Sequence, residues 1–559
     1  MPIKPLNELA EQKLMVTSAP LTSGVINRFF RREIPETAAQ ELKNIDASDP
    51  VVPQRRDGYA PIAIGTSGID GGYTSKRIGA LAWFNPSVGD KFFVISIPSL
   101  GSGKLYRTRD VTSLGWEEIV TSEDASVDLG STDSPWFQAN DKLWMLPGPG
   151  GRIAVIGDDA IAEVAGDDPA DAPAGAVDGV YLLERVFLLV GRKVFWSGSL
   201  PTSAVGGFDE DTQSLTMSPN RGASSVAMRS WRDGSLIVWF DLTVEEMVVD
   251  PSDPSDSIRN VIESSIGCCS RASVVSLGDD FYFADQWGQI RSLKRSGEGK
   301  NMGVVPVPLS EPIKAEIPGR VNKLAMAKIR TVVFDDHMEV YYPRDSSTEA
   351  NARFTWDFST KSWYGPDVLA DPVGQVTVSN IRERGEERFS TNGESASPAA
   401  NVFLWDQGAY TDNGDAIEFL ETTRSMDLGA PESRKRWMWL ELEYYGDSGV
   451  APTVEARRQE DGEDWIELEL VSGTNPCEDV SDFPLVPSDF PLVPEDFPLE
   501  TTTRKTARAR YQLDSDVVRP SRCLEVRIGE DSTGLAFQRR ALRLLAQVDP
   551  WEENPTDDD

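Results

Sequence analysis

Short runs of aromatic and branched apolar residues recur along the chain at nearly even intervals, and this recurrence limits the possible folds most. Six runs each follow or begin at a polar residue, and their starts lie 43 to 51 residues apart, with a mean of 48. The runs are KFFVI at 91, KLWML at 142, RVFLL at 185, SLIVW at 235, DFYFA at 280 and TVVFD at 331. A seventh run, NVFLW, begins at 401 after a polar stretch.

A period of about 40–50 residues with several short strands per unit is typical of a β-propeller. The 45 Gly and 37 Pro among 559 residues supply the many turns that such a fold requires. We therefore predict an all-β chain in which residues 59–425 form a β-propeller of six or seven blades. The alternative is a set of unrelated strands that happen to be evenly spaced.

The sequence on either side of the predicted propeller has a different texture. Residues 1–58 are rich in proline and polar residues, which indicates an extended N-terminal arm. Residues 426–550 contain alternating segments that predict a separate β-sandwich, and residues 551–559 form an acidic tail.

In RKRWMWLELEYYG the alternation places one set of side chains on one face, namely Trp437, Trp439, Glu441, Glu443 and Tyr445. The opposite face then carries Met438, Leu440, Leu442 and Tyr444. TVEARRQEDGEDWIELEL is a hairpin candidate with a Glu-Asp-Gly turn.

A proline-rich insertion, residues 473–503, interrupts the predicted sandwich. SDFPLVP at 481 is repeated at 488, and EDFPLE follows at 495, so Phe483, Phe490 and Phe497 recur every seven residues. Proline cannot donate a backbone hydrogen bond, which rules this segment out as a central strand. It is either a low-complexity loop or a docking strip that meets a repeated surface of a partner, with these three phenylalanines as the candidate docking residues.

The net charge of −35 argues against stable binding of nucleic acid, which needs clustered Lys and Arg. The charge serves either solubility alone or a surface that DNA passes without being gripped. Cys268 and Cys269 are neighbours, while Cys477 and Cys523 stand alone, so we expect no disulfide framework and a reducing cytoplasm. The N-terminus does not read as a secretory signal, and no apolar stretch reaches the length of a membrane span.

The residues also disfavour familiar enzyme chemistry. His337 is the only histidine, which excludes most Ser-His-Asp and Cys-His arrangements and any multi-histidine zinc site. YRTRDVTSLGWEE at 106 faintly resembles the Asp-box turn of sialidases, but it lacks the tight spacing and does not recur. YTDNGDAIE at 410 lacks the ligand spacing of a calcium loop and is better explained by an Asn-Gly turn between strands. We predict a protein that is not an enzyme, with no catalytic residue, no cofactor and no metal.

Three passages together resemble the nozzle, or tail hub, proteins of short-tailed bacteriophages, also called packaged-DNA stabilisation proteins. The passages are VFWSGSLPTSAVGGFDED at 194, SSIGCCSRASVVSLGDDFYFADQWGQIRSL at 264 and YTDNGDAIEFLETTRSMDLGAPESRKRWMWLELEY at 410. The likeness is a pattern of strands and turns over residues 180 to 445, and the Phe-Pro-Leu repeat has no counterpart in it.

The resemblance implies a structural protein of the virion tail, made in the host cytoplasm. Copies would form a ring, expected to be a hexamer, below an adaptor and portal. The ring would extend the DNA channel, retain packaged DNA and hold a tail fibre, spike, tip or needle, while DNA passes without specific binding. Two alternatives stay open: a virion-associated β-propeller that binds or hydrolyses glycans, and a cellular scaffold propeller that binds peptides.

Overall fold

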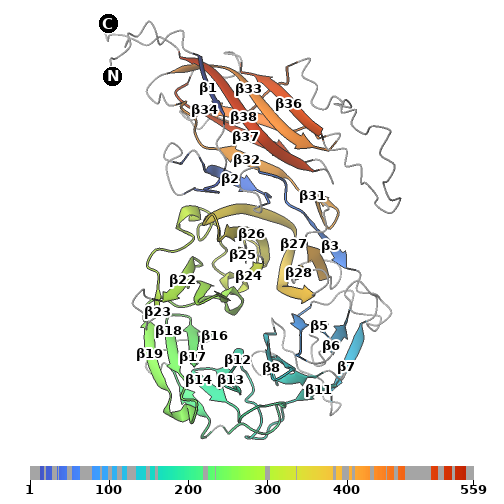
Figure 1. The fold of residues 1–559 in the computed structure, drawn as a ribbon, viewed down its shortest axis with the longest axis vertical. Coiled ribbons are helices and arrows are strands. Elements are labelled where there is room, and N and C mark those ends of the chain that lie inside the picture. Colours follow the sequence, from blue (N-terminus) through green and yellow to red (C-terminus); the bar gives the residue numbers. More distant parts are fainter. Residues whose placement is uncertain are drawn as a thin grey trace, which may run out of the picture. The chain divides into compact units, whose positions relative to one another are not determined.

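A computed structural model shows a chain built almost entirely of strands, and it divides into two compact units (Figure 1). One unit comprises residues 59–354 and 369–407, and the other comprises residues 1–58, 355–368 and 408–559. The residues that the structure describes are 13–17, 21–27, 34–35, 37–46, 53–62, 78–87, 91–97, 104–109, 116–121, 134–146, 151–157, 161–209, 211–217, 224–232, 234–295, 302–334, 336–381, 385–392, 402–405, 410–428, 434–447, 450–458, 464–471, 505–513, 521–531 and 536–548.

The first unit is a β-propeller, which confirms the predicted fold. Its sheets are antiparallel meanders arranged around a centre (Figure 1). Blades one to three are β4(Ala80–Phe84) β5(Phe92–Ile97) β6(Lys104–Thr108) β7(Glu117–Thr121), β8(Trp136–Ala139) β9(Lys142–Met145) β10(Ala154–Ile156) β11(Ile161–Val164), and β12(Asp178–Leu182) β13(Arg185–Val190) β14(Lys193–Trp196) β15(Ser214–Thr216). Blades four and five are β16(Ser225–Trp231) β17(Ser235–Phe240) β18(Val244–Val248) β19(Ile258–Glu263) and β20(Val275–Leu277) β21(Asp280–Ala284) β22(Ile290–Arg295) β23(Met302–Val304). Short 3-10 turns lie between strands at η3(Pro254–Asp256), η4(Arg271–Ser273), η5(Glu311–Ile313) and η6(Met326–Lys328).

The last two blades share one long strand. β24(Arg330–Phe334), β25(His337–Tyr342) and β26(Ala350–Asp357) lead into β27(Ser362–Ile381), which then pairs with β28(Gly385–Asn392) through its second half. β29(Val402–Trp405) follows β28, and β3(Tyr59–Ile62) pairs with β29 as the outer strand of this blade. Within the described residues the propeller therefore has seven blades, and its ring is closed by a strand from the start of the unit.

The apolar runs form strands because each is covered on both faces by a neighbouring blade. In β17, Leu236, Val238 and Phe240 pack with residues of the third blade, whereas Ile237 and Trp239 pack with residues of the fifth. All five of these side chains are fully buried. A strand buried on both faces reads as a continuous apolar run, which is why the period was visible in the sequence.

The first five runs are the second strands of blades one to five, whereas the last two occupy other positions in their blades. TVVFD forms β24, the first strand of the sixth blade, and NVFLW forms β29, the third strand of the seventh. The second strands there are β25 and β28, which carry the buried Glu339 and Arg388. Charged residues interrupt the apolar run in the second strands of these two blades. The continuous apolar run therefore occurs in a different strand, β24 in the sixth blade and β29 in the seventh.

Polar contacts link neighbouring blades near the starts of their first strands. They include Asp178 Oδ2 with Met228 N at 2.9 Å, Ser270 Oγ with Ile329 O at 2.6 Å, and Gln375 Nε2 with Gly79 O at 3.2 Å. Asp178 also pairs with Arg229 and lies 3.5 Å from Arg271 Nη1. These hydrogen bonds run around the propeller, across the sheets, and add to the packing between blades.

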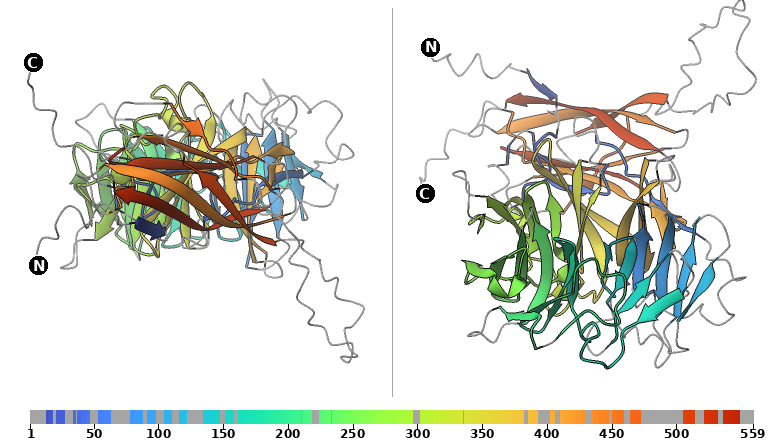
Figure 2. Two further views of the ribbon diagram at one scale, coloured as in Figure 1. Left: turned by 90° about the horizontal axis from the view of Figure 1, so that it is seen from above. Right: turned by 60° about the horizontal axis from the view of Figure 1, so that its bottom comes forward.

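The second unit is the predicted β-sandwich, and its two layers are visible in the right-hand view of Figure 2. One sheet has the order β1(Lys13–Thr17), β38(Phe537–Val548), β33(Lys435–Gly446), β36(Lys505–Gln512). The other has the order β2(Ala39–Lys43), β32(Phe419–Thr423), β37(Leu524–Glu530), β34(Thr453–Arg458), β35(Ile466–Glu467). Phe419 and Phe537 join the layers, with ring centroids 4.7 Å apart.

Residues 1–58, treated above as an extended arm, supply a strand to each sheet of the sandwich in their described part. β1 pairs with β38 from Lys13 opposite Gln547 to Thr17 opposite Arg543, and β2 pairs with β32. The hairpin of β34 and β35 agrees with the prediction, although its predicted turn lies outside the described residues. β30(Thr411–Asp412) and β31(Asp415–Ala416) flank Asn413 and Gly414, whose φ values of 51° and 94° make the expected Asn-Gly turn.

The predicted alternation in β33 is wrong at Trp437. A bulge between Trp437 and Trp439 shifts the register against β38, so Trp437 points inward and is buried with Leu440 and Leu442. Its indole nitrogen donates to Ser521 Oγ at 2.9 Å, which satisfies the buried polar group. Among the described residues, no helix is long and apolar enough to cross a membrane.

Candidate functional site

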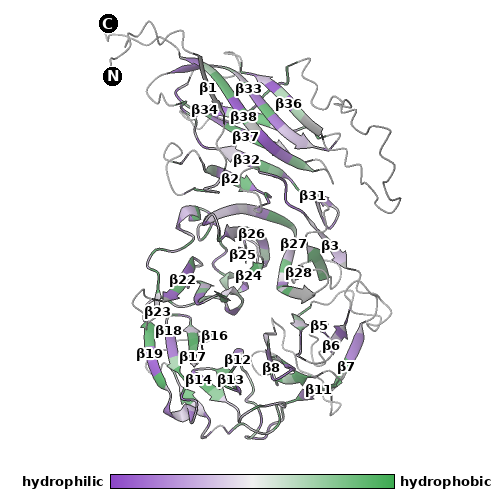
Figure 3. Ribbon diagram, viewed as in Figure 1, coloured by the Kyte–Doolittle hydropathy of each residue, from purple (hydrophilic) through white to green (hydrophobic). Residues whose placement is uncertain are grey.

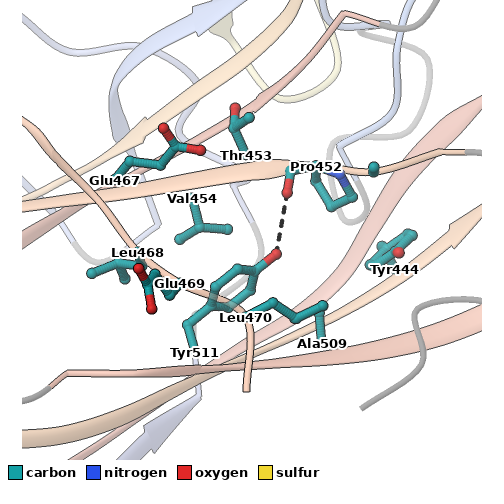
Figure 4. A pocket seen from close by; sticks show the side chains of 11 residues that line it. Tyr444, Pro452, Thr453, Val454, Glu467, Leu468, Glu469, Leu470, Ala509 and Tyr511 are labelled. Atoms are coloured by element: carbon teal, nitrogen blue, oxygen red, sulfur yellow. Dashed lines mark hydrogen bonds between the residues drawn. The ribbon is translucent and has the colours of Figure 1, made fainter. Parts of the chain in front are cut away.

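A pocket of 720 Å³ lies between the two sheets of the sandwich (Figure 4). Residues of β34 and β35 and their flanks line one side, and residues of β33 and β36 line the other. The lining residues are Tyr444, Ala451, Pro452, Thr453, Val454, Glu467, Leu468, Glu469, Leu470, Ala509 and Tyr511.

The floor of the pocket is apolar because it is made from the inward-facing positions of these strands. Val454, Leu468 and Ala509 are almost fully buried, and Leu468 N donates to Val454 O at 2.8 Å. Strand alternation directs Thr453 and Glu467 outward at the same time, and both are exposed. The floor can therefore receive an apolar group without leaving backbone donors unsatisfied.

Two tyrosines close the inner end of the pocket, and their hydroxyls are already engaged. Tyr511 donates to Pro452 O at 3.2 Å, as drawn in Figure 4, and Tyr444 donates to Val450 O at 3.5 Å. Burial raises the pKa of Tyr511 to about 12. This phenol stays protonated at neutral pH and acts as a fixed hydrogen-bond donor that ties the sheets together.

Carboxylates and one apolar side chain form the rim. Glu467 and Glu469 are exposed, and Leu470 is 42% exposed. Among the lining residues there is no nucleophile next to a base, so the arrangement suits binding of an apolar group beside a positive charge.

Two of the segments that line the pocket flank the proline-rich insertion in the sequence. Glu467 to Leu470 come just before the insertion, and Ala509 and Tyr511 come just after it. The predicted docking residues Phe483, Phe490 and Phe497 lie outside the described residues, so their role stays a prediction. Sequence reasoning missed the pocket, because its walls come from four separate segments spread over residues 444–511.

A second concentration of polar groups lies inside the propeller, around Glu339. Arg353 Nη1 donates to Glu339 Oε1 at 2.8 Å, Arg388 pairs with the same oxygen, and Tyr341 donates to Oε2 at 2.8 Å. Both guanidinium groups also lie over the ring of Trp405, at 5.1 Å for Arg353 and 4.4 Å for Arg388.

The pKa shifts of Glu339 and Tyr341 indicate that these residues stabilise the fold and do not take part in catalysis. Burial alone would raise the pKa of Glu339, but Arg353 and Arg388 outweigh burial and lower it to about 2. Burial and the nearby Glu339 raise the pKa of Tyr341. Neither group titrates near neutral pH, so neither is suited to exchange protons with a substrate.

The other residues considered in the sequence fall into ordinary strands and turns. His337 begins β25 opposite Phe334. Cys268 is buried and donates its thiol to Ser270 O at 3.1 Å, and burial raises the pKa of Cys268 to about 11. In the passage that faintly resembles an Asp-box, Arg107 and Glu117 pair across β6 and β7 at 3.0 Å. The described residues contain no cluster of three or more His, Cys, Asp or Glu that could hold a metal ion.

No protein-family model matches the chain, and no curated protein matches it. Among solved structures, YCF48 bound to D1 peptide is 10% identical, covering 60% of this chain and 96% of its own, with a TM-score of 0.34. BBS1N in complex with ARL6DN is 10% identical, covering 63% of this chain and 98% of its own, with a TM-score of 0.37.

Proposed function

We propose that the chain is a structural subunit of the tail of a short-tailed bacteriophage, where it forms a nozzle or hub ring in the virion. The ring extends the DNA channel below an adaptor and portal, retains packaged DNA and holds a fibre, spike, tip or needle. The three passages of residues 194–211, 264–293 and 410–444 support this proposal by their resemblance to nozzle proteins.

The observation that carries the proposal is that both units are closed by pairing an early strand with a late one. β3 pairs with β29 in the propeller, and β1 pairs with β38 in the sandwich. Such closure leaves fewer free sheet edges, and opening either unit requires several backbone hydrogen bonds to break together. This resistance to opening suits a protein that holds DNA under pressure.

The net charge of −35 supports passage of DNA without binding, since an acidic channel wall repels phosphates. The proposal therefore expects an acidic inner surface in the assembled ring. A ring whose inner surface is strongly positive would contradict this part of the proposal.

Electron microscopy of the purified chain with its adaptor tests the main claim. The expected result is a ring, six copies in the simplest case, that stacks coaxially on the adaptor. A chain that remains a monomer with the adaptor and hydrolyses members of a glycan panel would overturn the proposal and favour the glycan-acting propeller instead.

A further inference from the structure

The outer face of the first sandwich sheet carries a group of arginines that is unusual in so acidic a chain. We call it the arginine face, and it consists of Arg508, Arg510, Arg540 and Arg543 with Glu441, Glu443, Trp439 and Tyr445. Figure 3 shows hydrophilic residues recurring along β33 and β38 of this sheet. Strand alternation explains the segregation, because Leu440, Leu442, Ala507 and Ala509 occupy the buried positions in between.

The arginine face has a surplus of positive charge. Glu441 accepts from Arg510 at 3.0 Å and from Arg543 at 2.6 Å. Glu443 lies 3.4 Å from Arg508 and 3.0 Å from Arg543. Three guanidinium groups thus share two carboxylates, and Arg540 adds a further charge, so the face carries two more positive than negative charges.

The arginines are held in place and still reach solvent. Arg510 lies 4.8 Å from the centre of the Trp439 ring, and Arg540 lies 5.6 Å from that of Tyr445. The side chains of Arg508 and Arg510 are 64% and 48% exposed. A guanidinium has five N–H donors, so a positioned and exposed one can bind a further carboxylate. The aromatic rings beside them offer apolar contact at the same place.

The insertion supplies the complementary chemistry. Residues 472–503 contain seven Asp and Glu and no Lys or Arg, and each of Phe483, Phe490 and Phe497 directly follows an aspartate. An Asp-Phe unit offers one carboxylate for an arginine and one ring for stacking on an arginine or aromatic side chain. The acidic rim of the sandwich pocket, by contrast, would repel such a segment.

We propose that the arginine face binds an Asp-Phe-Pro-Leu unit from residues 481–500 of a second copy of this chain. Each chain has three units and one face, so even if a chain's own unit filled its face, two units would remain that only other copies could bind. In extended, proline-rich backbone the seven-residue period spans about 22 Å. The face extends about 10 Å across its three strands and about 20 Å along β33 from Trp439 to Tyr445, both less than one period, so one face takes one unit. The other units are then available to further copies, which raises the overall affinity.

This inference deepens the proposed function by naming a contact between copies, and it rests on that function only for the ring. The contact itself is measured without any ring. A labelled peptide of residues 481–500 is titrated by fluorescence anisotropy against the chain lacking residues 481–500. We expect saturable binding that weakens at least tenfold between 50 and 300 mM NaCl, because the attraction is largely electrostatic.

Charge reversal at the face should remove this binding. Arg508→Glu with Arg510→Glu, made in the deleted chain, is expected to weaken it more than tenfold, and Arg508→Gln with Arg510→Gln to weaken it less. The matched control is Arg152→Glu with Arg232→Glu, which changes exposed arginines of the propeller and should leave binding unchanged. Absence of binding, or equal binding to all variants, would overturn the proposal.

A complementation experiment identifies the source of the bound unit. The deleted chain keeps the face and lacks the repeat, whereas the full chain with the charge reversal keeps the repeat and lacks the face. Sedimentation should show each alone as a monomer and the mixture as complexes of one full chain with one to three deleted chains. The unmodified chain, which keeps both the face and the repeat, is measured beside them and should self-associate. If the peptide binds the face but the unmodified chain stays monomeric, the contact lies within one chain and the proposed contact between copies is wrong.

Discussion

Arg353 and Glu339 form an ion pair inside the propeller, with Nη1 of the arginine 2.8 Å from Oε1 of the glutamate and both side chains 6% exposed. Arg388 reaches the same carboxylate from the neighbouring blade. The contact joins the third strand of the sixth blade to the second strands of the sixth and seventh blades. A single carboxylate therefore links two blades, beside the apolar cluster that the same blades share.

Replacing Glu339 should destabilise the propeller strongly. Glu339→Ala leaves Arg353 and Arg388 buried without their carboxylate, and removing one partner of such a buried group typically costs about 3–5 kcal/mol. Denaturant unfolding followed by tryptophan fluorescence measures the loss. Glu311→Gln, which removes one partner of the exposed pair with Lys314, should change the stability by less than about 0.5 kcal/mol.

The contribution of Glu339 should also fade in acid. Its pKa in the folded chain, about 2, is below the ordinary value of 4.5, so its stabilisation is complete above pH 4.5 and is lost as the pH falls toward 2. The difference in unfolding free energy between the parent and Glu339→Gln should shrink by roughly 3 kcal/mol from pH 5 to pH 2. A difference that stays constant with pH would show that the carboxylate is not held ionised.

Deleting residues 1–17 should expose the edge of β38. β1 pairs with Arg543 to Gln547, and without it the outward backbone groups of those residues would face water or another chain. Hydrogen exchange should speed up for alternate amides over residues 543–547, while amides of β13 in the propeller keep their protection. Unchanged exchange in β38 would show that β1 does not protect this edge.

The described cysteines should resist modification in the folded chain. Cys268 and Cys523 are buried, and burial raises the pKa of Cys268 to about 11 and that of Cys269 well above its ordinary value. Because the thiolate is the reactive form, a Cys477→Ser chain should show almost no reaction with a thiol reagent at pH 7.5 and three reactive thiols in guanidinium. Rapid reaction of one thiol, or a disulfide between Cys268 and Cys269, would contradict the observed packing.

The sequence was most informative where strands are buried on both faces. The runs that became β5, β9, β13, β17 and β21 were recognisable because both of their faces meet apolar neighbours. The sixth and seventh blades escaped the pattern because Glu339, Arg353 and Arg388 satisfy one another across strands that are distant in the sequence. Hydrophobic periodicity does not report such pairing.

Local features that depend on the register between paired strands could not be predicted from the sequence either. The bulge that turns Trp437 inward arises from its pairing with β38, about a hundred residues later. The sandwich pocket and the arginine face both require β33 and β36 to lie side by side, although the insertion separates them. The repeat was visible at once, whereas the surface proposed to bind it became apparent only with the strand order.

The pairing of Ile62 with Val402 has a consequence for synthesis, since the two residues are 340 positions apart. As the chain leaves the ribosome, β3 emerges first and must wait for β29 before the circle can be completed. Closing so long a loop is slow, and a truncated product ending before residue 402 would keep a gap beside its first blade. Proteases in the cell could then distinguish incomplete chains, because a propeller without β29 leaves the edge of β3 unpaired and accessible.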